Sequence, residues 1–161
     1  MAIHRISKTA NVPDAIALLK ADHKQVRQLF TQFEHSRAAS KKKHLATEIC
    51  AALTAHTTME EEIFYPAFLA GTRDVAMHHE AEIEHDGAKN LIAQIQASDP
   101  SDDYYESKVT VLSDMIKHHV KEEERPAGMF AEARGCKTMD LKALGAQLAR
   151  RKKELMVELA E

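Results

Sequence analysis

The sequence predicts an all-α protein, an up-down-up-down antiparallel four-helix bundle with an additional C-terminal helix. Composition is the first reason, because the 161 residues include only five glycines and four prolines, too few for a turn-rich β fold. The second reason is spacing, since apolar residues recur every three or four positions in five segments and none alternates as a strand would. A single domain is expected over 1–161, with the bundle at about 13–134 and the extra helix at about 138–160.

Helix-breaking signals separate the five segments. "NVPD" at 11–14 predicts a helix start, because proline suits the first turn. "SRAASKKK" at 36–43 is the next break, followed by "AGTRD" at 70–74 with a glycine stop and a capping aspartate. "ASDPSDD" at 97–103 combines turn and cap residues, and "RGCKTMD" at 134–140 precedes the last helix. Short connections of this kind make consecutive helices antiparallel.

Each of the first four segments carries one stripe with a mean spacing of about 3.5 residues, which is typical of packed helices. The stripes run through Ile16, Leu19, His23, Val26, Phe30 and Phe33; through Leu45, Ile49, Ala52, His56, Met59 or Glu60, and Ile63; through His78, Ala81, His85, Ala88, Ile92 and Ile95; and through Val109, Leu112, Ile116, His119 and Glu123. The fifth segment, 140–160, has five leucines at helical spacing and is expected to pack on the outside.

Polar side chains interrupt these stripes where leucine or isoleucine would be expected. Six residues do so: His23, His56, Glu60, His85, His119 and Glu123. A carboxylate buried in a dry bundle is costly unless its charge is compensated, and no lysine or arginine shares the stripes near these glutamates. The six residues therefore predict a cation held between the helices.

Helical phase selects His119 over its neighbour His118. Only His119, with Glu123 four residues later, continues the stripe, whereas His118 lies about 100° away around the helix. Depth is an independent check, because the six residues lie at similar distances from the turns that join their helices, mostly within two helical turns. All six side chains are therefore expected to converge on one level.

Two His-x-x-x-Glu pairs suit a metal site, because residues four apart on a helix project side by side. Imidazole suits iron, zinc, copper or nickel, and carboxylates can bridge two ions. Six ligands could serve one octahedral ion, but carboxylates on opposing helices fit a bridged pair better. The spacing alone does not choose the metal.

The segments "DHKQVRQLF", "HTTMEEEIFYP", "EHDGAKNLI" and "HHVKEEE" together resemble the hemerythrin-like HHE cation-binding family, over 14 to about 134. The resemblance implies a four-helix bundle around two non-haem iron ions, joined as an oxo- or hydroxo-bridged di-iron centre. It implies terminal ligands at His23, His56, His85 and His119, and bridging carboxylates at Glu60 and Glu123. Iron enters the prediction only through this resemblance.

Two departures from the family pattern stand out. Oxygen-carrying hemerythrins supply two histidines four apart on the third helix, whereas the residues four positions from His85 are Ala81 and Lys89. A tyrosine, a carboxylate such as Glu82, or solvent could fill the gap. The second departure is "EEERPAGMF", where Pro126 and Gly128 are expected to break the fourth helix just past Glu123.

The resemblance favours a binding protein for O2 or a related small ligand, NO or peroxide, in oxygen or iron handling or sensing. The alternative is a di-iron redox enzyme with peroxidase- or catalase-like or nitrogen-oxide-reducing activity, which the missing histidine favours because metal catalysis needs open positions. A purely structural metal clip is disfavoured, since so apolar a bundle should fold without help.

Composition narrows the partners and the compartment. The formal net charge of −3 gives no indication of nucleic acid or an anionic membrane, and two isolated cysteines exclude a disulfide framework. No apolar run approaches the ~20 residues of a membrane span, and the stretch 1–14 lacks the apolar core of a signal peptide. We expect a cytoplasmic protein without nucleic-acid or membrane partners, and a weak homo-oligomer is left open.

Overall fold

The structure is a computed structural model that describes residues 11–161. Residues 1–10, most of the stretch predicted to lack the apolar core of a signal peptide, lie outside it. The described chain is helical throughout. Its elements are α1 (Ala15–His35), α2 (Ala39–Met59), the π-helix η1 (Glu60–Phe64), α3 (Tyr65–Thr72), α4 (Val75–Gln96), α5 (Tyr105–Glu124), α6 (Met129–Gly135) and α7 (Leu141–Glu158). The predicted all-α class is confirmed for these residues.

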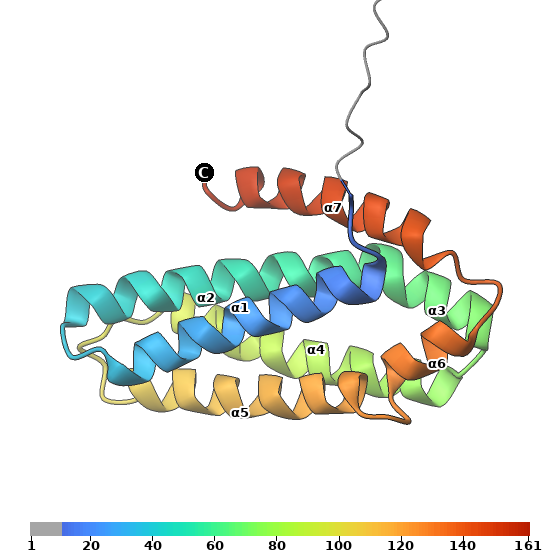
Figure 1. The fold of residues 1–161 in the computed structure, drawn as a ribbon. Helices are drawn as coiled ribbons and strands as arrows, with labels where there is room; N and C mark the ends of the chain where they lie inside the picture. The colour runs from blue at the N-terminus through green and yellow to red at the C-terminus, as the bar shows by residue number, and fades with distance from the viewer. Residues whose placement is uncertain (1–10) are drawn as a thin grey trace, which may run out of the picture.

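Figure 1 shows the long helices α1, α2, α4 and α5 running side by side, with α3 extending the line of α2. Helix α1 packs on α2, α4 packs on α5, and α7 lies across α1 and α2. Three helices start at an aspartate whose side chain accepts a hydrogen bond from the backbone N–H three residues later: Asp14, Asp74 and Asp140, at 2.8, 3.0 and 3.0 Å. These caps satisfy donors that a helix start otherwise leaves free.

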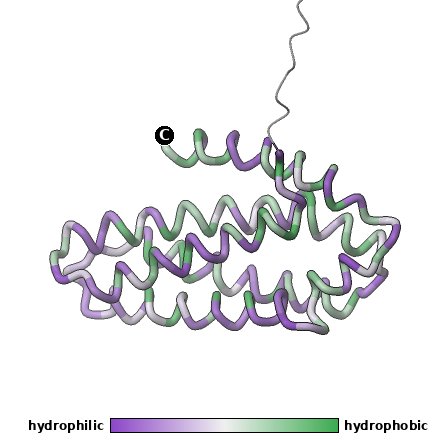
Figure 2. The backbone as a smooth tube through the Cα atoms, viewed as in Figure 1, coloured by the Kyte–Doolittle hydropathy of each residue, from purple (hydrophilic) through white to green (hydrophobic). Residues whose placement is uncertain are grey.

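Two apolar clusters fill the interior. The first contains Leu19 and Met59 and extends to α7, and the second contains Val26 and Ile49 and extends to α5. His23 lies between Leu19 and Val26 on α1, so the polar residues of the stripes occupy the level between the two clusters. Figure 2 shows hydrophobic and hydrophilic residues mixed along every long helix, and within 11–161 none is long and apolar enough to cross a membrane.

The helical boundaries depart from the sequence prediction at two places. Helix α2 begins at Ala39, inside the predicted break at 36–43, because alanine and lysine favour helix and only residues 36–38 leave it. The expected glycine stop at Gly71 is wrong, since α3 continues to Thr72 and Arg73 adopts the left-handed conformation at φ 59°. Gly71 instead allows close packing, because a Cβ there would lie 2.8 Å from Met139 Cγ.

The π-helix was not predicted. At Glu60–Phe64 the hydrogen bonds run from residue i+5 to residue i, and the N–H of Tyr65 donates to the carbonyl of Glu60. Pro66 gives a physical reason, since a proline inside a helix has no N–H and its ring clashes with the carbonyl four residues earlier. Widening the turn ahead of Pro66 relieves that clash and changes the direction in which the following side chains point.

Candidate metal centre

The structure brings all six stripe residues together in one buried cluster. They are exposed by 5% or less: His23, His56, Glu60, His85, His119 and Glu123. They form two overlapping groups, His23, His56, Glu60 and Glu123 in one, and Glu60, His85 and His119 in the other. Within each group the ligand atoms lie within 4.8 Å of one another, so each group could hold a metal ion.

We call His23 and His56 the first half-site and His85 and His119 the second half-site. In the first, the two Nε2 atoms lie 3.2 Å apart, and Glu60 Oε1 lies 3.1 Å from His56 Nε2. In the second, the two Nε2 atoms also lie 3.2 Å apart, and Glu60 Oε2 lies 3.0 Å from His85 Nε2. Glu60 therefore offers one oxygen to each half-site.

Glu123 also spans the two half-sites, through a single oxygen. Its Oε1 lies 3.3 Å from His23 Nε2 and 3.1 Å from His119 Nε2. Its neighbour Glu122 is 37% exposed at the side chain, and His118 is 64% exposed. Helix α5 therefore packs with His119 and Glu123 facing the cluster and with His118 and Glu122 facing outward, as the helical phase predicted.

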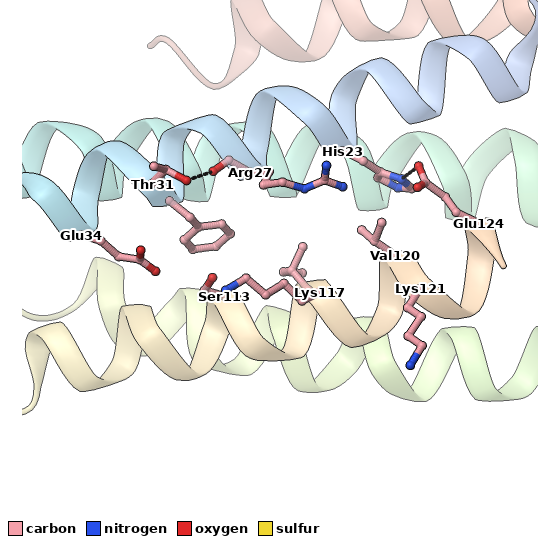
Figure 3. Close-up of a pocket in the computed structure, with 11 residues that line it drawn as sticks. His23, Arg27, Thr31, Glu34, Ser113, Lys117, Val120, Lys121 and Glu124 are labelled. Atoms are coloured by element: carbon pink, nitrogen blue, oxygen red, sulfur yellow. Dashed lines mark hydrogen bonds and ion pairs between the residues drawn. The ribbon is translucent and has the colours of Figure 1, made fainter.

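Carboxylates outside the cluster orient three of the four imidazoles. His23 Nδ1 donates to Glu124 at 3.0 Å, as the dashed line in Figure 3 shows, and His56 Nδ1 donates to Asp22 at 3.2 Å. His119 Nδ1 donates to Glu84 at 2.5 Å. A proton on Nδ1 leaves Nε2 with its lone pair toward the cluster, which is the tautomer that binds metal.

The fourth imidazole is held differently. His85 Nδ1 is buried and has no hydrogen-bond partner among the described residues. Its Nε2 instead lies 3.0 Å from the hydroxyl oxygen of Tyr65. That hydroxyl donates to Glu60 Oε2 at 3.1 Å and lies 3.3 Å from His119 Nε2, so it reaches both imidazoles of the second half-site.

Tyr65 brings a further oxygen atom to the second half-site, for which the sequence offered one histidine fewer than the family pattern. Of the alternatives left open, Glu82 lies away from the cluster, with its carboxylate half exposed and 3.6 Å from His78. Tyr65 was not singled out because it follows Glu60 by five residues, about 140° around a regular α-helix. The π-helix brings residues five apart onto one face, so the phenol joins the carboxylate. Pro66 was the signal that could have revealed it.

Helix α7 supplies a further layer of charge around the first half-site. Lys152 Nζ donates to Asp22, the same carboxylate that holds His56. Arg151 Nε donates to Glu62 at 2.7 Å and so ties α7 to the π-helix. The sequence placed the C-terminal helix on the outside, but its contribution to the site was missed because sequence spacing does not show which helix it meets.

The charges of the cluster compensate one another. Burial lowers the pKa of His56, but the charge of Glu60 and hydrogen bonds to Asp22 and Glu60 outweigh it and raise that pKa to about 10. Burial also lowers the pKa of His119, but the charge of Glu123 outweighs it and holds that pKa well above its usual value. Burial raises the pKa of Glu60, but His56 and the other imidazoles outweigh it and hold it well below its usual range.

The residues present fit a bound cation. Glu60 and Glu123 are buried carboxylates, and no lysine or arginine of the described chain forms an ion pair with either. One oxygen of each, Oε1, is buried and accepts no well-aligned hydrogen bond, although imidazole Nε2 atoms lie 3.1–3.3 Å from it. An unpaired buried acceptor is costly, so a positive charge at the centre of the cluster would satisfy both. Imidazole and carboxylate together suit a borderline transition-metal ion.

Over residues 11–161 these features define an all-α protein with a buried His/Glu cluster that could hold metal, and comparison with known families identifies it further. Residues 14–130 match the family model of the hemerythrin HHE cation-binding domain, so the chain belongs to that family. A solved HHE domain-containing protein from Mycobacterium kansasii has the same fold, with a TM-score of 0.75 and 24% identity, covering 91% of this chain and 89% of that one.

A curated relative, a DNA nickase of Nostoc sp., is 32% identical over 126 residues. The match covers 77% of this chain but only 34% of the nickase. The chain thus spans about a third of that longer protein.

Proposed function

We propose that this chain is a non-haem di-iron protein that binds O2 or a related small ligand, NO or peroxide, in oxygen or iron handling or sensing. In this proposal His23, His56, His85 and His119 are terminal ligands, while Glu60 and Glu123 bridge the two ions within an up-down-up-down four-helix bundle. The observation that carries it is the division of six buried ligand residues into two groups that share Glu60. A carboxylate common to two groups suits a pair of ions better than one ion.

The residues of the chain would perform three tasks. Two iron ions, when bound, supply reversible ligand binding and electron transfer at one small centre. Asp22, Glu84 and Glu124 hold the Nδ1 protons, so that the lone pairs of His56, His119 and His23 point inward. The apolar clusters on either side limit the access of water to the centre. The Tyr65 hydroxyl can ligate the second half-site or donate a hydrogen bond to a ligand bound there.

The second candidate is a redox enzyme that decomposes peroxide or reduces a nitrogen oxide. Tyr65 favours it, because a phenol in place of a histidine offers the second half-site a ligand that can also donate a proton. Burial raises the pKa of Tyr65, as do the charges of Glu123 and Glu60, so the phenol keeps its proton in the absence of metal. Nicking of DNA is not proposed, since the chain carries a net charge of −3 and spans a third of the nickase.

Metal content and an anaerobic-to-aerobic absorption spectrum of the isolated protein test the proposal. We expect about two irons per chain, and colorimetric iron near zero would refute it. A band that forms with O2 and disappears under vacuum would favour the binding protein. Rapid catalytic loss of peroxide without such a band would favour the enzyme.

A further inference from the structure

A cavity between α1 and α5 borders the ligand cluster at His23, and most of its lining residues have no role in the function proposed above. Its volume is about 250 Å³, and it reaches His23 and Glu124 at one end and Thr31 and Glu34 at the other. Figure 3 shows the Arg27 side chain extending into the space between the two helices. A cavity of this size has room for several waters or a small organic molecule.

The lining is both apolar and cationic. Phe30, Ile116 and Val120 form its apolar part. Arg27, Lys117 and Lys121 also line it; all three are exposed, and within 11–161 no carboxylate lies within ion-pair distance of any of them. The small opening beside His119 is mainly acidic, because Glu80, Glu84 and Glu122 line it together with one arginine, Arg125. The positive lining is therefore a property of this cavity, not of every opening toward the cluster.

Ser113 supplies an independent observation. It lines the cavity, is 3% exposed, and its Oγ has no hydrogen-bond partner among the described residues. A serine inside a helix usually donates to the carbonyl four residues earlier, so an unpaired buried hydroxyl is unexpected. A polar atom of a ligand lying in the cavity would satisfy it.

We propose that this cavity binds a small organic monocarboxylate with an apolar body. The apolar part would pack against Phe30, Ile116 and Val120. The carboxylate would meet Arg27, Lys117 and the unpaired hydroxyl of Ser113. An arginine that is free of other ion pairs can donate two parallel hydrogen bonds to one carboxylate, which favours a carboxylate over a neutral polar group. Glu34, at the other end of the cavity, is negatively charged and should repel a bound anion. Removing its charge should therefore strengthen the binding of a carboxylate.

Benzoate is the probe, with benzamide as its neutral counterpart, measured by isothermal titration calorimetry on the protein as isolated. We expect benzoate to bind more tightly than benzamide or inorganic phosphate, and its affinity to fall as salt rises. Equal affinity for benzamide would show a merely apolar cavity, and equal affinity for phosphate would show a merely cationic surface. Either result would overturn the proposal, as would the absence of benzoate binding.

Variants locate the binding. The double substitution Arg27→Gln with Lys117→Gln should weaken benzoate binding at least about tenfold, because charge-assisted hydrogen bonds are lost. Lys24→Gln, on the same helix but outside the cavity, should leave it unchanged, and Glu34→Gln should tighten it. Unchanged affinity in the double variant would place benzoate elsewhere, the metal cluster included. Iron content should stay the same in all four proteins, which separates this test from that of the di-iron centre.

Discussion

The two half-sites contain the same pair of imidazoles but are supported in different ways. In the first, both histidines donate to carboxylates, and Lys152 of α7 anchors one of these carboxylates. In the second, His119 has such a partner in Glu84, whereas the carboxylate nearest to His85 Nδ1, Glu61, is 3.9 Å away and forms no hydrogen bond with it. The Tyr65 hydroxyl contacts His85 on the other side, at Nε2. In the first half-site, carboxylates outside the cluster orient both imidazoles. In the second, a carboxylate orients only one imidazole, and the Tyr65 hydroxyl adds a hydrogen-bonding group inside the cluster. Chemistry that changes ligands is expected at the second.

The largest effect should come from the carboxylates that the half-sites share. Glu60→Ala or Glu123→Ala should remove both ions, because each glutamate contacts an imidazole of each half-site. Iron analysis should fall from about two per chain to near zero, as happens when a ligand set is broken. Glu122→Ala is the control and should keep its iron, since that side chain is 37% exposed. Iron retained in Glu123→Ala and lost in Glu122→Ala would contradict the assignment.

Proton competition should make the affinity for metal strongly dependent on pH in both half-sites. Burial lowers the pKa of His56, but Glu60 and Asp22 outweigh it and raise it to about 10, so metal must displace a proton. Affinity should therefore rise with pH up to about 10, roughly tenfold per unit for each proton displaced.

The metal-free protein should show the opposite trend. The raised pKa of His56 stabilises the folded state fully below the unfolded value of about 6.5, and this contribution is lost as pH rises through about 10. Denaturant unfolding after chelation, measured from pH 6 to 10, checks the sign. Stability that rises over this range would show that the His56–Glu60 pair does not hold a proton.

The outer carboxylate of the first half-site should have the next largest effect. Asp22→Asn removes the charge that holds His56 and pairs with Lys152, and partners of this kind are typically worth 10–100-fold in metal affinity. In a stepwise iron titration, the loss of affinity should affect only the ion held by the first half-site. Asp86→Asn, an exposed change on α4, is the matched control. Equal loss from both half-sites would show that they are not supported separately.

The phenol should have the smallest effect on binding and should affect the other ion. Tyr65→Phe keeps the packing but removes the hydroxyl near His85 and His119, so we expect the second ion to bind about tenfold more weakly. Tyr105→Phe, buried in the second apolar cluster, controls for loss of a phenol elsewhere. If Tyr65 ligates ferric iron, the visible spectrum should also change in Tyr65→Phe alone.

Helical phase explains why much of the site could be predicted from the sequence. A ligand that replaces leucine on a packed stripe must face the core, so His23, His56, His85 and His119 could be placed from spacing alone. The same rule separated Glu123 from Glu122. The all-α class followed from the same periodicity, because a regular helix repeats its geometry at every residue.

Tertiary structure decided what depends on irregular backbone or on contacts between distant segments. Tyr65 reaches the cluster only because the π-helix ahead of Pro66 rotates it there, and no regular period describes that turn. Asp22 meets Lys152 across 130 positions of the chain, and Glu84 meets His119 across 35. In the sequence, these outer partners look like ordinary polar residues on helix surfaces. Only the packing of the helices brings them onto the imidazoles that they orient.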